Sequence, residues 1–489
     1  MTTRLCLISS FTVALASLAL GVVARAGPLT LDDAIRLALE KNQRVKVSAF
    51  SPQIGRANVL AAYGAFDPAL TFRRTYSENN TPASVSLLLP RSFTQEDDYS
   101  LSLDGLSPWG MTYSLGATAT NQRGSANRFT DNYATFGGLS VTQPLLRGFG
   151  FGATLATLRV AKANRSISDW QHRQTIIDTV TNVIFIYNNL QQARANVAIA
   201  RLSRELAAQL LTENEKKIRV GATSDADVTQ ARARVANREE NILFAERSVH
   251  DIENQLRQAI GETTFQTDAP PLETVELAPA ADLTVDAMVD VKKAYELRPD
   301  YQAARFGVTI DRANQSAAQN ALLPRLDFVG SYGYAGLDAN FATARAQVRD
   351  EDARAYSAGV VVSVPLTFAA GRGRARAAKL TLRQSEADLV RLEQDIALSV
   401  ATAAGQIETT KQRVAATRIA MDLAQQELTN EQKRFTAGTS STFLVSNAQQ
   451  DLSAAQSSYA RAVADQRRAV ADYERELGTT LEVHHITVQ

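Results

Sequence analysis

The sequence predicts a mixed fold that combines an all-α part with membrane β-strands. Long antiparallel coiled-coil helical hairpins form the α part and continue into the strands. Three features predict it: an internal duplication, two proline-free helical stretches of 66 and 63 residues, and alternating strand-length segments before each stretch. The duplication is direct, because residues 42–72 align without a gap onto residues 298–328 with eleven identical positions. A repeat of this size indicates one architecture built from two similar halves.

The first 26 residues have the pattern of a secretory signal peptide. Arg4 precedes an apolar run from Leu5 to Val23, and Ala24-Arg25-Ala26 provides a small-residue exit. The only cysteine, Cys6, lies in this segment, so the cleaved chain has none. No later segment approaches the roughly 18 apolar residues of a spanning helix, so we expect strands to make any membrane crossing.

The charge balance gives no sign of a nucleic-acid partner. Removing residues 1–26 removes two of the 52 basic residues and no acid, which leaves 50 against 51 acidic residues. A domain that binds nucleic acid usually carries a basic patch, which this near-neutral chain lacks. The sequence also contains no protease or hydrolase motif and no cysteine pair, so we expect no enzyme, no cofactor and no metal.

The predicted organisation is two repeats, 27–261 and 289–478, joined by a proline-containing linker at 262–288 and followed by a tail at 479–489. The first repeat comprises a helix, strands at about 69–143, a long helix at 154–219 and a return helix at 223–260. The second comprises a helix, strands at about 326–366, a long helix at 374–436 and a return helix at 440–477. At 1.5 Å per residue, each long helix would span roughly 95–100 Å.

The long segments repeat apolar residues at helical spacing, for example Ile176, Val180, Val183, Tyr187 and Leu190. Steps of three and four residues keep one stripe against a partner helix, which is typical of coiled coils. An ordinary four-helix bundle remains an alternative on this evidence alone. A glycine ends each long helix, Gly221 in the first repeat and Gly438 in the second, because glycine readily adopts the left-handed conformation that stops a helix.

Each incoming helix ends before a proline, Pro68 or Pro324, and alternating residues follow. Strands of nine to eleven residues can cross a bilayer when tilted. The polar stretches 78–95 and 335–354 are expected to form exposed loops. The repeat shift falls from 256 before the strands to 221 after them, so the first half carries 35 extra residues, in which an added hairpin surrounds residues 107–110. We expect four strands per chain; whether the added hairpin joins their sheet is left open.

Two or three hairpins cannot close a barrel alone, and each unpaired backbone group at a lipid-exposed edge costs several kcal/mol. A slab of helical hairpins likewise has two open sides. A ring of identical subunits would satisfy both parts, so we expect assembly from several copies.

Several segments resemble recurrent blocks of the TolC-type outer-membrane efflux channels. They are LTLDDAIRLALEKN (29–42), QPLLRG (143–148), RPDYQAAR (298–305), VPL (364–366) and the tip pattern from Gly221 to Val228. The resemblance implies a homotrimer whose periplasmic α-barrel is continuous with an outer-membrane β-barrel assembled from several chains and surrounded by outer-membrane lipid. It implies a passive exit duct that docks to a periplasmic adaptor (membrane fusion protein) and an inner-membrane transporter, in efflux or type I secretion. The alternative is a non-channel periplasmic coiled-coil scaffold.

The resemblance also indicates where the duct would close. The family places acidic rings at the sixth and ninth positions after the tip glycine of the second repeat, where this chain has Leu444 and Asn447. The first repeat has Asp227 and Gln230 at those positions. We expect an aperture sealed by apolar packing of Leu444, although Leu444 as an ordinary seam residue remains an equal alternative. The residues expected to form the hairpin tips and the adaptor-docking surface are Gly221, Ala222, Thr223, Gly438, Thr439 and Ser440.

Overall fold

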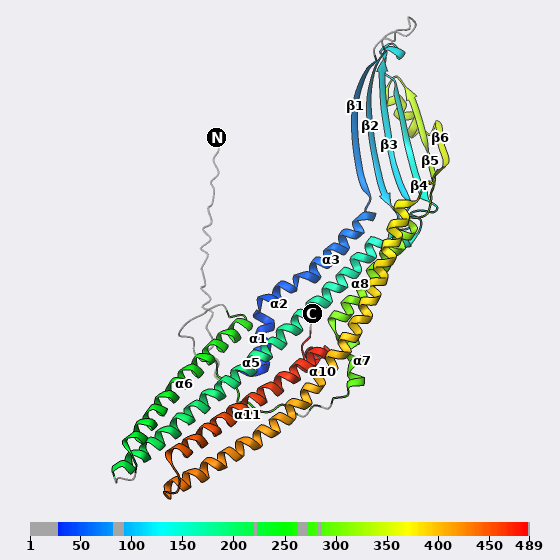
Figure 1. Cartoon of the computed structure of the whole chain (residues 1–489). Helices are drawn as coiled ribbons and strands as arrows, with labels where there is room; N and C mark the ends of the chain where they lie inside the picture. Colours follow the sequence, from blue (N-terminus) through cyan, green and yellow to red (C-terminus); the bar gives the residue numbers. More distant parts are fainter. Residues whose placement is uncertain are drawn as a thin grey trace, which may run out of the picture.

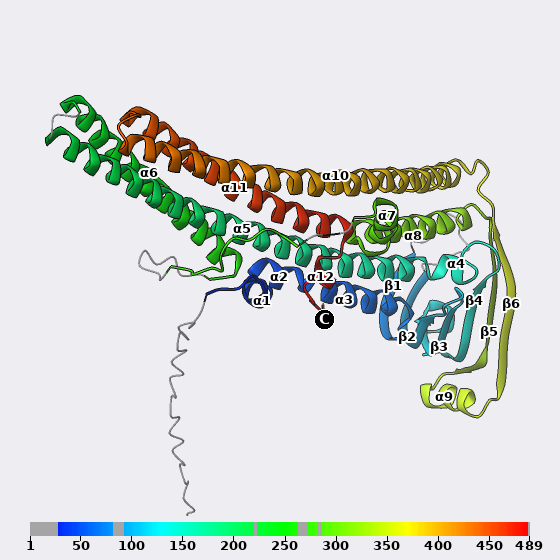
Figure 2. The same ribbon diagram turned by 90° about the horizontal axis from the view of Figure 1, so that it is seen from below.

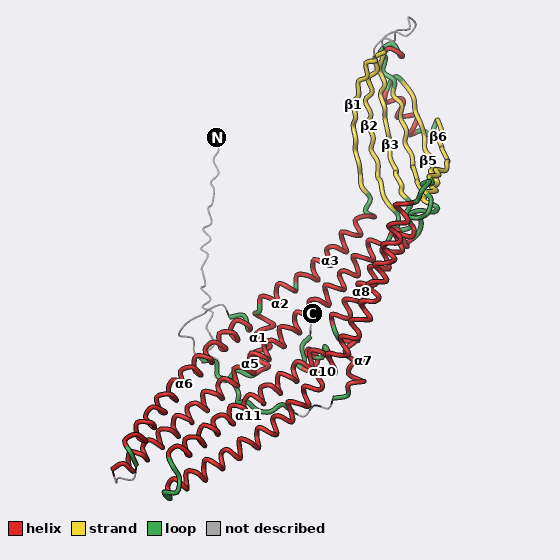
Figure 3. Tube along the Cα trace, viewed as in Figure 1, coloured by secondary structure: helices red, strands yellow, loops and turns green. Residues whose placement is uncertain are grey.

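The computed structural model describes residues 28–81, 92–219, 223–262, 271–281, 283 and 285–487. Within these residues the chain is elongated, with an antiparallel sheet at one end and long helices that extend away from it (Figures 1 and 3). The predicted signal peptide and two of the predicted tip residues, Gly221 and Ala222, lie outside the described residues.

Both halves follow the order helix, strands, long helix, return helix. The first half contains α1 (Leu31–Lys41), α2 (Gln43–Ser48), α3 (Phe50–Tyr63), β1 (Ala69–Thr81), β2 (Ser92–Leu106), β3 (Thr112–Gly124), β4 (Tyr133–Pro144), α4 (Phe151–Thr154), α5 (Ala156–Arg219) and α6 (Asp225–Ala259). The second half contains α7 (Ala287–Leu297), α8 (Pro299–Asn320), β5 (Arg325–Asp338), α9 (Phe341–Arg349), β6 (Ala353–Ser363), α10 (Ala369–Thr436), α11 (Thr442–Leu477) and α12 (Thr480–Val483).

The contacts between the helices place them in four columns that lie side by side, and together the columns form a slab (Figures 1 and 2). Two helices, α5 and α10, run its full length. On one side, α5 packs against α3 near the sheet and against α6 farther from it. On its other side, α5 packs against α8 near the sheet and against α11 farther from it, and both of these helices also contact α10. The slab therefore has two outer columns, α3 with α6 on one side and α10 on the other.

Apolar seams explain why these long helices pair. The stripe predicted on α5 is buried: Val180, Val183 and Leu190 are fully inaccessible to solvent, and Ile176 and Tyr187 are nearly so. Burying an aliphatic side chain of this size stabilises the fold by about 1.5–3 kcal/mol, so a few such turns outweigh the weak helix propensity of the valines and isoleucines.

Within the described residues, six strands form one antiparallel sheet in chain order, β1 to β6. The expectation of four strands was wrong, because the added hairpin β2–β3 lies inside the sheet between β1 and β4. Its turn is anchored at the helical end, where the amide of Gly150 donates to the carbonyl of Trp109 at 3.0 Å. None of the helices in the described part of the chain combines the length and hydrophobicity needed to span a bilayer.

Both polar stretches expected to be loops contain regular secondary structure. Pairing of β1 with β2 continues outward to Thr81 and Ser92, through pairs such as Glu78 with Gln95. Backbone hydrogen bonds maintain the ladder there, and they do not depend on apolar side chains. Within 335–354, β5 runs to Asp338 and the short helix α9 follows it. The hydroxyl of Thr135 on β4 donates to the carbonyl of Ala344 at 2.9 Å, which holds α9 against the sheet.

Candidate functional site

Near the helices, the strand register gives the sheet one mainly apolar and one mainly polar face; farther along the strands, the ion pair of Arg74 with Asp97 lies on the apolar side. One row of directly paired residues crosses all six strands with apolar side chains: Leu70, Leu103, Leu115, Leu139, Tyr332 and Tyr356. The neighbouring polar row on the opposite face reads Asp104, Ser114, Ser140, Ser331 and Ser357. We call these the apolar face and the polar face. The apolar side chains are exposed, Leu70 at 73% and Tyr356 at 77%, so the apolar face lacks cover over much of its area.

Two edges of the sheet are unpaired in the described part of the chain, those of β1 and β6. The chain leads directly from α3 into β1, and from β6 toward α10. Because α3 and α10 belong to the two outer columns of the slab, the sheet and the helices are open on the same two sides (Figure 1).

At the far end of the slab, the first hairpin tip is organised by Asp227. Its carboxylate accepts hydrogen bonds from the hydroxyls of Ser224 at 2.7 Å and Thr223 at 2.9 Å, and from the Ser224 amide at 3.2 Å. The Ser224 hydroxyl in turn accepts from the Asp227 amide, which completes a capping box at the start of α6. These hydroxyl hydrogen bonds lower the pKa of Asp227, and the bond from Ser224 has the larger effect of the two. Gln230, one turn further on, is exposed.

The second tip turns at Gly438, whose φ of +78° is the left-handed conformation that ends α10. The amide of Thr439 donates back to the carbonyl of Arg434 at 2.9 Å. Ser440 donates to the carboxylate of Glu431, and Ser441 caps α11.

Leu444 does not belong to the seam inside the chain. Its side chain is 49% exposed, whereas Val445 and Ala448 beside it are buried between the hairpins, and Asn447 is half-buried. The predicted aperture residues therefore lie on one end of the slab, with Leu444 directed away from the packed core of its own chain.

Contacts between the two tips were not foreseen from the sequence. The ammonium of Lys217, near the end of α5, lies 3.3 Å from the centroid of the Phe435 ring and donates to the Phe435 carbonyl at 2.8 Å. The hydroxyl of Thr442 donates to the amide oxygen of Asn214 at 3.0 Å. The residues of each pair are more than 200 positions apart, and Lys217 is one of several charged residues at the end of α5, so no local signal in the sequence indicated these contacts.

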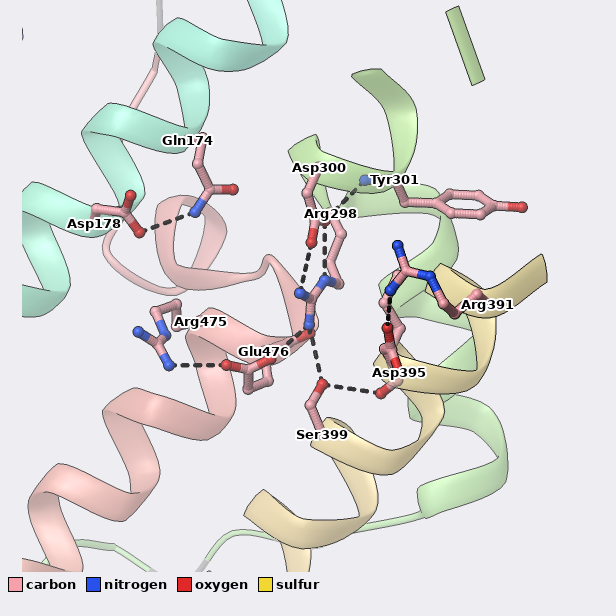
Figure 4. Close-up of polar contacts among 11 residues, drawn as sticks. Gln174, Asp178, Arg298, Asp300, Tyr301, Arg391, Asp395, Ser399, Arg475 and Glu476 are labelled. Carbon is pink, nitrogen blue, oxygen red and sulfur yellow. Dashed lines mark hydrogen bonds and ion pairs between the residues drawn. The ribbon is translucent and has the colours of Figure 1, made fainter. Parts of the chain in front are cut away.

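Midway along the slab, Arg298 links the second-half helices (Figure 4). From the start of α8 its guanidinium donates to Asp300 at 2.7 Å, to the Glu476 carbonyl at the end of α11 at 3.2 Å, and to the hydroxyl of Ser399 on α10 at 3.2 Å. It also pairs with the Glu476 carboxylate at 2.5 Å. Burial acts against these charges, but the guanidinium more than compensates and lowers the pKa of both Asp300 and Glu476.

No cluster of three or more histidine, cysteine, aspartate or glutamate side chains suited to a metal occurs among the described residues. Polar side chains at the two tips cap helices, and those around Arg298 form ion pairs.

This arrangement is that of an outer-membrane channel protein. The family model for outer membrane efflux proteins matches residues 34–262 and 291–479, and the chain belongs to that family. It is accordingly an outer-membrane protein that extends into the periplasm.

Sequence similarity to individual members is modest. The chain is 24% identical to outer membrane protein TolC of Vibrio cholerae over 210 residues, which is 43% of this chain and 47% of that protein. It is 24% identical to outer membrane efflux protein BepC of Brucella suis over 329 residues, 66% of this chain and 68% of BepC. The fold matches the outer-membrane channel OprN with a TM-score of 0.70 at 17% identity, over 92% of this chain and 89% of OprN.

Proposed function

We propose that three copies of this chain form a passive exit duct, with a β-barrel in the outer membrane and an α-helical tunnel in the periplasm. The observation that carries the proposal is the coincidence of open sides: β1 and the α3–α6 column face one way, and β6 and α10 the other. A head-to-tail contact between different surfaces of identical subunits generates a ring when the rotation closes. One such contact would join β1 of one copy to β6 of the next and, at the same time, the α3–α6 column of one copy to α10 of the next.

The two faces of the sheet support the same assembly. In a membrane barrel the outward residues are apolar and the inward residues polar. The row from Leu70 to Tyr356 fits contact with lipid, and the row from Asp104 to Ser357 fits a water-filled lumen. In the alternative function, a periplasmic scaffold without a pore, the exposed apolar row would have no role.

We further propose that the helical tips dock to a periplasmic adaptor, which connects the duct to an inner-membrane transporter in efflux or secretion. The tips lie at the end of the molecule farthest from the sheet, where a partner from the inner membrane would reach them (Figure 1). The docking surface comprises Thr223, Gly438, Thr439 and Ser440, together with Gly221 and Ala222. Site-specific crosslinking from Thr223 and Ser440 would capture the adaptor; crosslinks only to unrelated proteins would contradict this part.

The aperture is proposed to close by apolar contact among the three Leu444 side chains. Leu444 is exposed and free to meet its copies, whereas the Asp227 carboxylate is already engaged by the cap of α6. Asn447 and Gln230 would line the same opening as neutral polar groups.

The decisive experiment is reconstitution of the mature protein in planar bilayers. A trimer that dissociates only on heating and conducts single-channel current is expected, with higher conductance in Leu444→Ser and little change in Asp227→Asn. A folded monomer, soluble without detergent, would instead support the scaffold function. Divalent-cation block abolished by Asp227→Ala, with Leu444→Ala silent, would contradict the apolar seal.

A further inference from the structure

The β2–β3 hairpin has no counterpart in the second half of the chain. The first half contributes four strands to the sheet and the second half two, although each half contributes two columns to the helical slab. The added hairpin therefore widens the strand layer of each chain without widening its helical layer.

Helices pack roughly 8–10 Å apart, so four columns make a wall roughly 36 Å wide. Strands lie about 4.8 Å apart and tilt by roughly 40° in a barrel, so each occupies roughly 6.3 Å of circumference. Six strands then cover roughly 38 Å, whereas four would cover only roughly 25 Å. With the added hairpin, the strand wall of one chain matches the helical wall of the same chain.

We propose that the β2–β3 hairpin forms part of the pore wall, so that the outer-membrane exit is as wide as the helical tunnel. Three copies would close a barrel of eighteen strands, six from each. Its backbone diameter would be roughly 36 Å, against roughly 24 Å for twelve strands of the same tilt. Barrels of 16–18 strands hold an aqueous channel, so the exit would pass bulky hydrophilic solutes. This inference rests on the proposed channel function.

The contacts of the hairpin support a place in the wall. Both of its strands pair along their length, β2 with β1 and β3 with β4, so removing it would break the continuous ladder. Its faces follow the rest of the sheet, since Leu103 lies in the apolar row while the adjacent Ser102 lies on the polar face. A hairpin folded outside a narrower barrel would not continue both rows.

The absence of cysteine from the predicted mature chain allows a sharp test, because the one cysteine of the sequence is Cys6. Ser102→Cys and Leu103→Cys place single thiols on opposite faces of β2, and Ser140→Cys provides a matched polar-face thiol on β4. We expect a charged, membrane-impermeant thiosulfonate reagent to reduce single-channel conductance in Ser102→Cys and Ser140→Cys and to leave Leu103→Cys unchanged.

Neutral polymers of increasing size, added on the extracellular side, measure the exit width independently. Entry of polymers too large for a barrel about 24 Å across is expected. A response in Ser140→Cys without one in Ser102→Cys, or exclusion of all such polymers, would overturn the inference and leave the channel intact. If the unmodified protein formed no channel, the proposed function itself would fail, and the inference with it.

Discussion

The two halves of the chain build the same joint with different chemistry. In each half, a residue at the start of an incoming helix is bonded to the end of a return helix; we call this contact the joint. In the first half, the side-chain amide of Asn42 donates to the carbonyl of Ala259 at the end of α6, at 2.7 Å. At the matching place in the second half, Arg298 donates to the carbonyl of Glu476 at the end of α11, at 3.2 Å. The sites differ in charge: Asn42 is neutral, whereas Arg298 also holds two carboxylates.

The two halves therefore share a geometric requirement but meet it with different side chains. In each half the start of an incoming helix must be fixed to the end of a return helix. The close approach is visible at the glycines that follow those ends, because a side chain at Gly261 would meet Lys41 and one at Gly478 would meet Leu297. Because the geometry is shared and the side chains differ, the two joints should differ in strength and in their response to pH.

The largest effect is expected from Arg298→Ala. The substitution leaves the Glu476 carboxylate, whose side chain is only 16% exposed, without its main partner. Breaking a buried pair in this way costs about 3–5 kcal/mol, and the nearby Arg475 favours the lower end of that range. Asn42→Ala should cost only about 1 kcal/mol, the value of one hydrogen bond and a helix cap.

Chemical unfolding of the detergent-solubilised protein, followed by the far-UV signal of the helices, would measure both losses. Arg298→Lys is the matched control, because it keeps the charge but loses the forked geometry, and it should fall between the two. Equal losses in the Arg298 and Asn42 variants would show that charge adds nothing to the joint.

Acid should distinguish the two joints. Arg298 holds the pKa of Asp300 and Glu476 below the usual values, so their stabilisation is complete above the ordinary carboxyl pKa and is lost as pH falls through the lowered one. Burial raises the pKa of the neighbouring Asp472, whose protonation acts in the opposite direction and offsets part of the loss. Asn42 carries no titratable group, so its own hydrogen bond to the Ala259 carbonyl has no such dependence.

Hydrogen exchange would show this as protection at the end of α11 that falls more, as the pH drops from neutral to below the ordinary carboxyl pKa of about 4, than protection at the end of α6. Each unit of lowered pKa corresponds to about 1.4 kcal/mol, or a tenfold change in local opening. An Arg298→Lys variant should shift the onset of faster exchange to higher pH. Parallel behaviour of both helix ends would contradict the prediction.

The sequence indicated the helices better than the sheet, for physical reasons. Ile176 and its partners repeat at a helical spacing, and they lie within α5 (Ala156–Arg219), where their side chains are buried. Strand pairing depends on residues far apart in the chain. The Ser107–Gly110 turn suggested a hairpin, but nothing local showed that it would lie between β1 and β4. The roles assigned to the tip residues remain predictions.

The tips offer a smaller test of the same contrast. Lys217 joins them through its bond to the Phe435 carbonyl and its contact with the ring, worth about 0.5–2 kcal/mol. Lys217→Met should loosen the second tip and raise open probability in single-channel recordings severalfold. The neighbouring Lys216, which pairs with Glu213 on the surface, is the matched control, and Lys216→Met should leave gating unchanged. Equal effects would point to net charge rather than this contact.

The smallest effect is expected close to the largest one. Arg391 pairs with Asp395 at 2.9 Å near Arg298 (Figure 4), but its side chain is 66% exposed against 17% for Arg298. Exposed pairs of this kind contribute about 0–0.5 kcal/mol, because water screens the charges and ordering two long side chains opposes the gain. Arg391→Ala should therefore leave the unfolding midpoint almost unchanged, and high salt should remove what difference remains. If Arg391→Ala destabilised the protein as much as Arg298→Ala, burial would not explain the strength of the Arg298 joint. The difference in stability between the Arg298 and Asn42 joints would then depend only on the number of nearby charges.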